Sequence, residues 1–141
     1  MTSTIICQKN PKPKLVLVSA PPGSGKTYFA SRLEGYVLID DPKTKPIFEP
    51  DVNYVITDPK LCYHKVFDTV NALYPKAHWI FFRPNAVRCL QNVQKRLEKE
   101  PDKFISVREL VRFCSEYELN FKYYLESVSS YQIEEIYYEL V

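Results

Sequence analysis

The sequence predicts an α/β domain with a mostly parallel sheet of about five strands flanked by helices, and three observations lead to this fold class. Apolar runs of strand length alternate with segments of helical spacing along the chain. The run at 15–20 is apolar over nearly its full length, as expected of a strand that a parallel sheet buries on both faces. A length of 141 residues suits one domain with a single core.

The elements follow in order along the chain. We expect five strands, at residues 15–20, 36–39, 54–57, 78–82 and 132–140. We expect four helices, at residues 27–33, from 58 to about 74, from 85 through 97 and from 106 to about 128. Gly35 ends the first helix, Asp58 followed by proline caps the second, Asn85 caps the third, and Ser106 forms a capping box with Glu109.

Composition and charge exclude several classes of protein. No apolar run approaches the roughly 20 residues of a membrane span, and the N-terminus lacks the pattern of a signal peptide, so we expect a cytoplasmic protein without membrane contact. The cysteines lack paired spacing, which supports neither a disulfide framework nor a structural metal. They are Cys7, Cys62, Cys89 and Cys114.

The formal net charge of +2 is small but unevenly distributed. The first 33 residues carry five basic side chains and no acidic one, whereas six glutamates face only Lys122 from position 116 onward. We expect a basic leader at 1–14, a domain at 15–141, and one electropositive end that suits phosphate groups. A solvated tail and helix face would explain these charges equally well.

The most informative segment is Ala20-Pro21-Pro22-Gly23-Ser24-Gly25-Lys26-Thr27, between the first strand and the first helix. It matches the phosphate-binding P-loop pattern except at its first position, where alanine replaces glycine. The two glycines permit backbone conformations in which successive amides surround phosphates. Lys26 reaches the β- and γ-phosphates of ATP, and the Thr27 hydroxyl is placed to ligate Mg²⁺. The predicted nucleotide-binding residues are Gly23, Ser24, Gly25, Lys26 and Thr27. A glycine-rich turn without a ligand is the plainer interpretation.

Residues downstream of this loop narrow the kind of P-loop protein. The second predicted strand ends in Asp40-Asp41, close to where the first strand delivers the phosphates. A basic stretch follows the fourth strand, with Arg88, Lys95, Arg96, Lys99 and Lys103. A kinase needs a carboxylate to deprotonate the acceptor hydroxyl and a cation over the transferring group. The sequence therefore predicts a single-domain P-loop NTPase fold of the kinase type.

From about residue 15 to 117 the sequence resembles the kinase domain of phage polynucleotide kinase and its small P-loop relatives. The resemblance lies in Asp40-Asp41-Pro42-Lys43, in the strand ending Val55-Ile56-Thr57-Asp58, and in Asn92 shortly before Arg96. It implies ATP-dependent transfer of the γ-phosphoryl group to a hydroxyl of a nucleic-acid end, a nucleotide or a nucleoside, with Mg²⁺. It also implies that Asp40 is the general base, that Arg96 acts from a lid, and that Asp41 and Lys43 hold the acceptor. The family has arginine at the position of Lys43, and lysine cannot hold a phosphate bidentately.

Other interpretations of these residues stay open. Asp40 also suits the end of a strand at a proline turn, and Asp58 is either an N-cap or a magnesium-associated carboxylate. Arg88, Lys95 and Lys99 compete with Arg96 for the lid role. The tyrosines near the C-terminus either pack in the fold or stack on bases. The chain also suits a P-loop switch or NTPase without transfer activity, with Asp58 as its Walker-B carboxylate.

Overall fold

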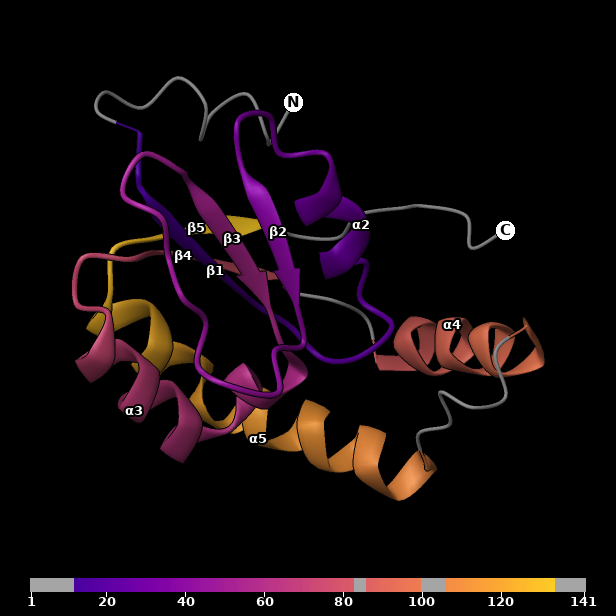
Figure 1. Ribbon diagram of the computed structural model, residues 1–141. Coiled ribbons are helices and arrows are strands. Elements are labelled where there is room, and N and C mark those ends of the chain that lie inside the picture. Colours follow the sequence, from indigo (N-terminus) through magenta and orange to yellow (C-terminus); the bar gives the residue numbers. More distant parts are fainter. Residues whose placement is uncertain (1–11, 83–85, 100–105, 134–141) are drawn as a thin grey trace.

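A computed structural model of the chain describes residues 12–82, 86–99 and 106–133 (Figure 1). Five strands within these ranges form one sheet, at Leu15–Ser19 (β1), Val37–Asp40 (β2), Tyr54–Thr57 (β3), His78–Phe82 (β4) and Ser130–Ile133 (β5). The helices are Lys26–Ser31 (α2), His64–Leu73 (α3), Ala86–Lys99 (α4) and Val107–Ser127 (α5), with the 3₁₀-helix Pro59–Cys62 (η1). The predicted α/β class is confirmed.

The strands lie in the order β2-β3-β1-β4-β5, and every neighbouring pair is parallel. All five carboxyl ends therefore meet at one edge of the sheet, which we call the carboxyl edge. The chain leaves β1 toward β2 on one side and leaves β4 toward β5 on the other. In open α/β sheets, ligands bind where neighbouring strands diverge in this way. The crevice between the ends of β1 and β4 is therefore the first place to look for a site.

The two faces of the sheet carry different cores. On one face Trp79 and Phe81 pack beneath η1, α3 and α5, and the Phe67 ring lies 4.7 Å from Trp79 and 4.3 Å from Tyr124 between ring centroids. On the other face Val18 and neighbouring apolar side chains pack against α2. Because both faces are covered, the central strands are apolar throughout instead of alternating, as the sequence predicted.

The single helix expected from 58 to about 74 is wrong, because Tyr63 adopts an extended backbone between η1 and α3. The Leu61 carbonyl accepts a hydrogen bond from the Ser19 hydroxyl at 3.2 Å, and the Cys62 carbonyl accepts one from the Tyr124 hydroxyl at 2.6 Å. Both carbonyls are thereby bonded to the core rather than to N–H groups of a continuing helix. Tertiary hydrogen bonds thus stop the helix that the local sequence favours.

Other predicted boundaries differ by a few residues. The first strand ends at Ser19, α2 spans Lys26–Ser31, β2 spans Val37–Asp40, and α4 extends to Lys99. The fifth strand begins earlier than expected, at Ser130, while residues 134–140 of that prediction and the cap Asn85 lie outside the described residues. Ser106 is confirmed as the N-cap of α5, since its hydroxyl accepts from the Glu109 N–H and donates to the Glu109 carboxylate, each at 3.1 Å.

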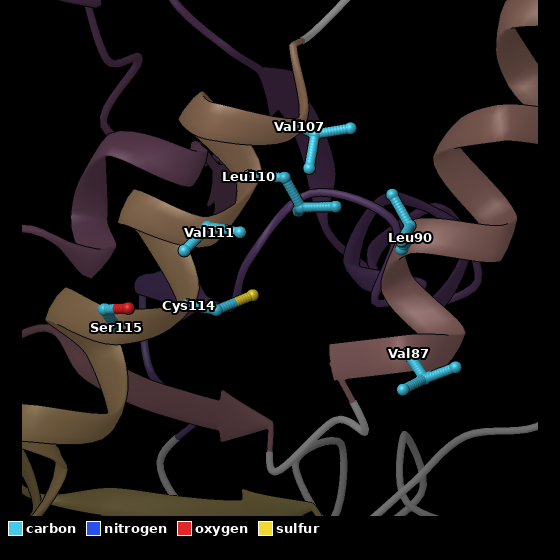
Figure 2. A pocket seen from close by; sticks show the side chains of 7 residues that line it. All are labelled: Val87, Leu90, Val107, Leu110, Val111, Cys114 and Ser115. Carbon is cyan, nitrogen blue, oxygen red and sulfur yellow. The ribbon is translucent and has the colours of Figure 1, made fainter.

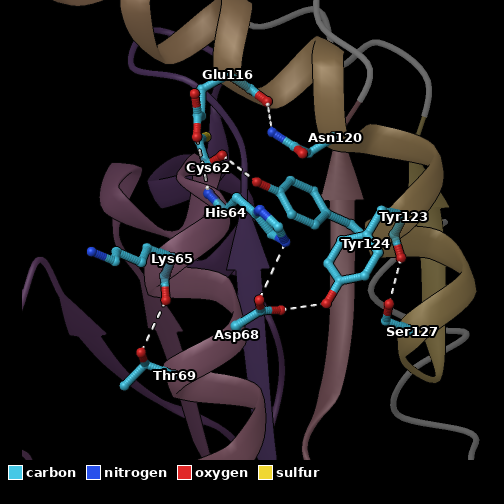
Figure 3. Close-up of polar contacts among 10 residues, drawn as sticks. All are labelled: Cys62, His64, Lys65, Asp68, Thr69, Glu116, Asn120, Tyr123, Tyr124 and Ser127. Carbon is cyan, nitrogen blue, oxygen red and sulfur yellow. Dashed lines mark hydrogen bonds and ion pairs between the residues drawn. The ribbon is translucent and has the colours of Figure 1, made fainter.

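Polar contacts join α3 to α5 (Figure 3). The Tyr123 hydroxyl donates to Asp68 at 2.5 Å, and His64 Nε2 lies 3.2 Å from the other oxygen of the same carboxylate. Tyr117 and Tyr124 bind main-chain carbonyls in the core, so packing is their role rather than stacking on bases. No helix in the described part of the chain is long and apolar enough to cross a membrane.

Candidate functional site

The loop formed by residues 20–27, which we call the glycine loop, connects β1 to α2 at the carboxyl edge. Gly23 and Gly25 have φ angles of 80° and 90°, in the left-handed region that glycine enters without steric cost. The loop lies at the crevice between β1 and β4, where the two chain directions diverge. The predicted nucleotide-binding residues are thus gathered in one turn of the backbone.

Lys26 is the buried cation of the glycine loop. Its side chain is 7% exposed, and its Nζ donates a long hydrogen bond of 3.4 Å to the Pro21 carbonyl. Burial lowers the pKa of Lys26, the nearby Arg96 guanidinium lowers it further, and Asp40 acts in the opposite direction. Within the described residues no carboxylate lies within ion-pair distance of this ammonium. A buried charge without a paired partner is costly, so the position suits an anion supplied from outside.

Ser24 adds a second buried polar group to the same loop. Its hydroxyl is buried and has no hydrogen-bond partner within the described residues. Buried hydroxyls are usually bonded, so such a group calls for an explanation. A phosphate oxygen beside Lys26 would satisfy both side chains, and the glycine loop therefore fits a nucleotide phosphate.

A carboxylate lies next to this loop, held by two threonines, one on strand β3 and one on helix α2. Asp40 Oδ1 accepts from the Thr57 hydroxyl at 2.6 Å and from the Thr27 hydroxyl at 3.2 Å. The parallel register of β2 and β3 places Asp40 directly beside Thr57. The other carboxylate oxygen, Oδ2, has no partner among the described residues, and Asp40 is exposed. The site therefore offers an oriented carboxylate on an exposed residue, with one oxygen unbonded within the described residues.

Thr57 is the residue that the sequence interpretation missed. Its hydroxyl makes the shorter of the two hydrogen bonds to Asp40. The available signal was its position, because it ends the third predicted strand just before Asp58. Two strands that end together in a parallel sheet bring their last side chains side by side.

The structure separates the remaining carboxyl-edge residues by role. Asp41 has a φ of 46°, and its carboxylate pairs with Lys43 Nζ at 3.1 Å; Lys43 is exposed and Asp41 is partly buried. These two predicted acceptor-binding residues therefore lie at the rim and face each other. Asp58 accepts from the Lys60 N–H at 2.9 Å, which confirms that it is an N-cap. Burial raises the pKa of its carboxyl.

The described side chains of the carboxyl edge do not form a complete metal site by themselves. In the described residues no group of three or more histidine, cysteine, aspartate or glutamate side chains is placed to hold a metal ion. Mg²⁺ in nucleotide sites takes few protein ligands and shares its remaining positions with phosphates and water. The Thr27 hydroxyl, 3.2 Å from Asp40, is the protein ligand that fits this arrangement.

Helix α4 contacts the glycine loop with one face and projects away from the sheet (Figure 1). Asn92 Nδ2 donates to the Gly23 carbonyl at 2.9 Å, and a Cβ added at Gly23 would overlap the Cys89 carbonyl and lie 3.1 Å from Val93 Cγ2. Arg96 follows Asn92 by one helical turn, so it lies on the same face. Among the cations that compete for the lid role, Arg96 is the one whose charge affects Lys26.

An apolar groove of about 300 Å³ separates α4 from α5 (Figure 2). Its lining consists of Val87, Leu90, Val107, Leu110, Val111, Cys114 and Ser115. Buried Cys89, Val93 and Leu110 form the small cluster between the two helices. The groove offers one hydroxyl, one thiol and no charged side chain, whereas the charged groups lie at the carboxyl edge.

Comparison with known proteins finds no matching family model and no curated protein that matches the sequence. The chemistry of the carboxyl edge therefore carries the functional conclusion.

Proposed function

We propose that the chain is an ATP-dependent phosphotransferase that moves the γ-phosphoryl group to a hydroxyl of a nucleic-acid end, a nucleotide or a nucleoside. The observation that carries the proposal is the buried, unneutralised ammonium of Lys26 in the glycine loop, next to the oriented carboxylate of Asp40. A cation for phosphates and a carboxylate for a hydroxyl are the two groups that phosphoryl transfer requires.

The glycine loop supplies the nucleotide-binding part of this proposal. Lys26 binds the β- and γ-phosphates, and its ammonium gains the anionic partner that the described residues do not offer. The Ser24 hydroxyl and the loop amides donate to phosphate oxygens. ATP supplies the transferred group, and Thr27 would hold a Mg²⁺ ion, which would neutralise charge on the phosphates.

Asp40 supplies the acceptor part. The Thr57 hydroxyl fixes one carboxylate oxygen at 2.6 Å and leaves Oδ2 of this exposed residue for an acceptor hydroxyl. Asp40 accepts the hydroxyl proton while the acceptor oxygen bonds to the γ-phosphorus and the bond to the β–γ bridging oxygen breaks. Arg96 stabilises charge on the transferring group from α4, and the exposed Lys43 binds a phosphate of the acceptor.

Transfer from γ-labelled ATP with Mg²⁺ tests the proposal, using DNA ends, RNA ends, nucleosides and nucleoside monophosphates as acceptors. We expect one acceptor class to be labelled by the wild type and not by Lys26→Met. Lys65→Met serves as the matched control, because Lys65 is exposed on α3 and should transfer normally. Release of labelled phosphate without a labelled acceptor would instead assign the chain as an NTPase. A folded wild type that does neither would overturn the proposal.

A further inference from the structure

We infer that Asn92 is a positioning residue, whose hydrogen bond to the Gly23 carbonyl both orients the backbone of the glycine loop and places Arg96 at the phosphates. The inference deepens the proposed function and rests on it, since it concerns how the same site holds a nucleotide. The juxtaposition behind it joins residues 69 positions apart in the sequence.

The first observation is the buried bond itself. The Asn92 side chain is 9% exposed, and its Nδ2 lies 2.9 Å from the Gly23 carbonyl oxygen. In a planar trans peptide the carbonyl and the following N–H point in opposite directions. Fixing the Gly23 carbonyl on α4 therefore fixes the Ser24 N–H in the direction away from α4. A loop that surrounds a phosphate with its amides needs each N–H held in one direction.

The second observation is the close approach of two backbones. A Cβ at Gly23 would overlap the Cys89 carbonyl of α4. The missing side chain lets the helix backbone contact the loop backbone, and Asn92, three residues after Cys89, bonds the loop at the point of contact. Glycine is therefore needed at position 23 for two reasons: the φ of 80° and the close approach of α4.

The third observation concerns Arg96. It lies one turn beyond Asn92 on the same face of α4, so the contact that seats α4 on the glycine loop also brings Arg96 toward the loop that contains Lys26. Lys26 is buried and Arg96 is partly buried, and two neighbouring cations repel each other unless an anion lies between them. By docking α4 on the loop, Asn92 holds Arg96 against this repulsion and has it in place when phosphates bind.

Binding of MgADP and MgATP at equilibrium tests this role, below the unfolding temperature of each protein. We expect Asn92→Ala to weaken both nucleotides by roughly tenfold or more, the scale of a lost hydrogen bond that supports a charged ligand. Gln91→Ala is the matched control, an amide lost from the exposed side of the same helix, and should bind as the wild type does. Arg96→Ala should weaken MgATP more than MgADP.

Two further readouts separate positioning from simple stabilisation. In the double variant Asn92→Ala/Arg96→Ala, the loss of Arg96 should reduce MgATP affinity by a smaller factor than Arg96→Ala does in the wild type. The reason is that Asn92→Ala has already displaced Arg96. The isosteric Asn92→Asp cannot donate when ionised but can donate when protonated. Its nucleotide affinity relative to the wild type should therefore recover as the pH falls, and this variant carries the test should Asn92→Ala fail to fold.

The outcomes distinguish this inference from the function on which it rests. A wild type that binds neither nucleotide overturns both. A wild type that binds while Asn92→Ala binds equally well, or Asn92→Asp that follows the wild-type pH profile, overturns the positioning role alone.

Discussion

Buried polar groups differ in their hydrogen bonding between two regions of the sheet: the face beneath α3 and α5, and the carboxyl edge. On the α3–α5 face, Tyr124 and Tyr117 donate to main-chain carbonyls at 2.6 and 3.0 Å, and their rings pack among other aromatic side chains. At the carboxyl edge, Lys26 is buried without a carboxylate partner, and the Ser24 hydroxyl has no bond within the described residues. The two tyrosine hydroxyls find their partners within the protein, whereas Lys26 and Ser24 would gain partners from a ligand.

The α3–α5 face also contains buried polar atoms without a hydrogen bond to any described residue. Within the described residues, the indole N–H of Trp79 and the hydroxyl of Tyr74, which packs against this core, are also buried without a hydrogen bond. A neutral N–H costs far less to bury than an ammonium, and the ring packing of Trp79 against Phe67 and Phe81 offsets that cost. Charge, rather than an unsatisfied atom alone, is what distinguishes the carboxyl edge. Substitutions should therefore separate stability from function between the two regions.

Lys26→Met should have the largest functional effect, abolishing phosphoryl transfer while leaving the fold intact. The side chain is buried and unneutralised, so methionine fills the same space and removes the charge that serves the phosphates. Labelled-ATP transfer and urea unfolding measured on the same preparation check both halves. A variant that transfers normally, or one that is unfolded in buffer, would break the comparison.

Phe67→Ala should produce the opposite outcome at the aromatic face. Phe67 is fully buried between Trp79, Phe81 and Tyr124, so truncation should lower the free energy of unfolding by about 3–5 kcal/mol. Nucleotide affinity at low temperature should stay at the wild-type value. Leu73→Ala on the same helix is the control, because Leu73 is 46% exposed and its loss should change the unfolding free energy by under about 0.5 kcal/mol. Equal destabilisation by both variants would show that α3 packs differently.

Asp40→Asn sharpens the comparison within the carboxyl edge. Asparagine keeps the size and can still accept from Thr57, but it cannot take the acceptor proton, so kcat should fall by roughly a hundredfold. ATP affinity should change little, because Lys26 and the loop hold the phosphates. Steady-state kinetics with the identified acceptor provide the measurement, and Asp51→Asn, exposed and distant in sequence, is the control. An unchanged kcat would leave Asp40 with only its structural bonds to two threonines.

Much of the fold follows from the sequence because local and global preferences agree along the strands. The predicted strands at 54–57 and 78–82 match β3 and β4, since a strand covered on both faces must be apolar throughout. The break at Tyr63 could not be predicted, because it depends on hydrogen bonds from Ser19 and Tyr124, which are distant in sequence. Local patterns contain no information about such partners.

The candidate site was predictable to the same degree. The glycine loop follows β1 and Asp40 ends β2, and both strand ends are recognisable in the sequence. The structure brings the loop and Asp40 together through the hydrogen bond from Thr27. The contributions of Thr57 and Asn92 required the sheet register and the docking of α4, which no short motif specifies. Their roles emerge only once distant segments are placed side by side.

The smallest expected effect is a pH dependence that belongs to Lys26 alone. Burial puts the pKa of folded Lys26 below its ordinary value of 10.5, which we take for the unfolded chain. Below the folded pKa both states are protonated, and the full cost of burying the charge is present. Between that pKa and 10.5 the unfolded state binds more protons, so stability rises with pH. The free energy of unfolding of the wild type should therefore gain on that of Lys26→Met as the pH is raised through this window. Urea unfolding of both proteins at several pH values checks the slope, and parallel curves would show that Lys26 is not desolvated.

The central claim is that the carboxyl edge holds the phosphates of a nucleotide, and calorimetric titration of the folded protein with MgATP tests it most directly. The account predicts saturable binding at one site by the wild type and by Phe67→Ala, and its loss in Lys26→Met. A folded wild type that shows no binding at millimolar MgATP, or a Lys26→Met variant that binds as tightly as the wild type, would contradict it.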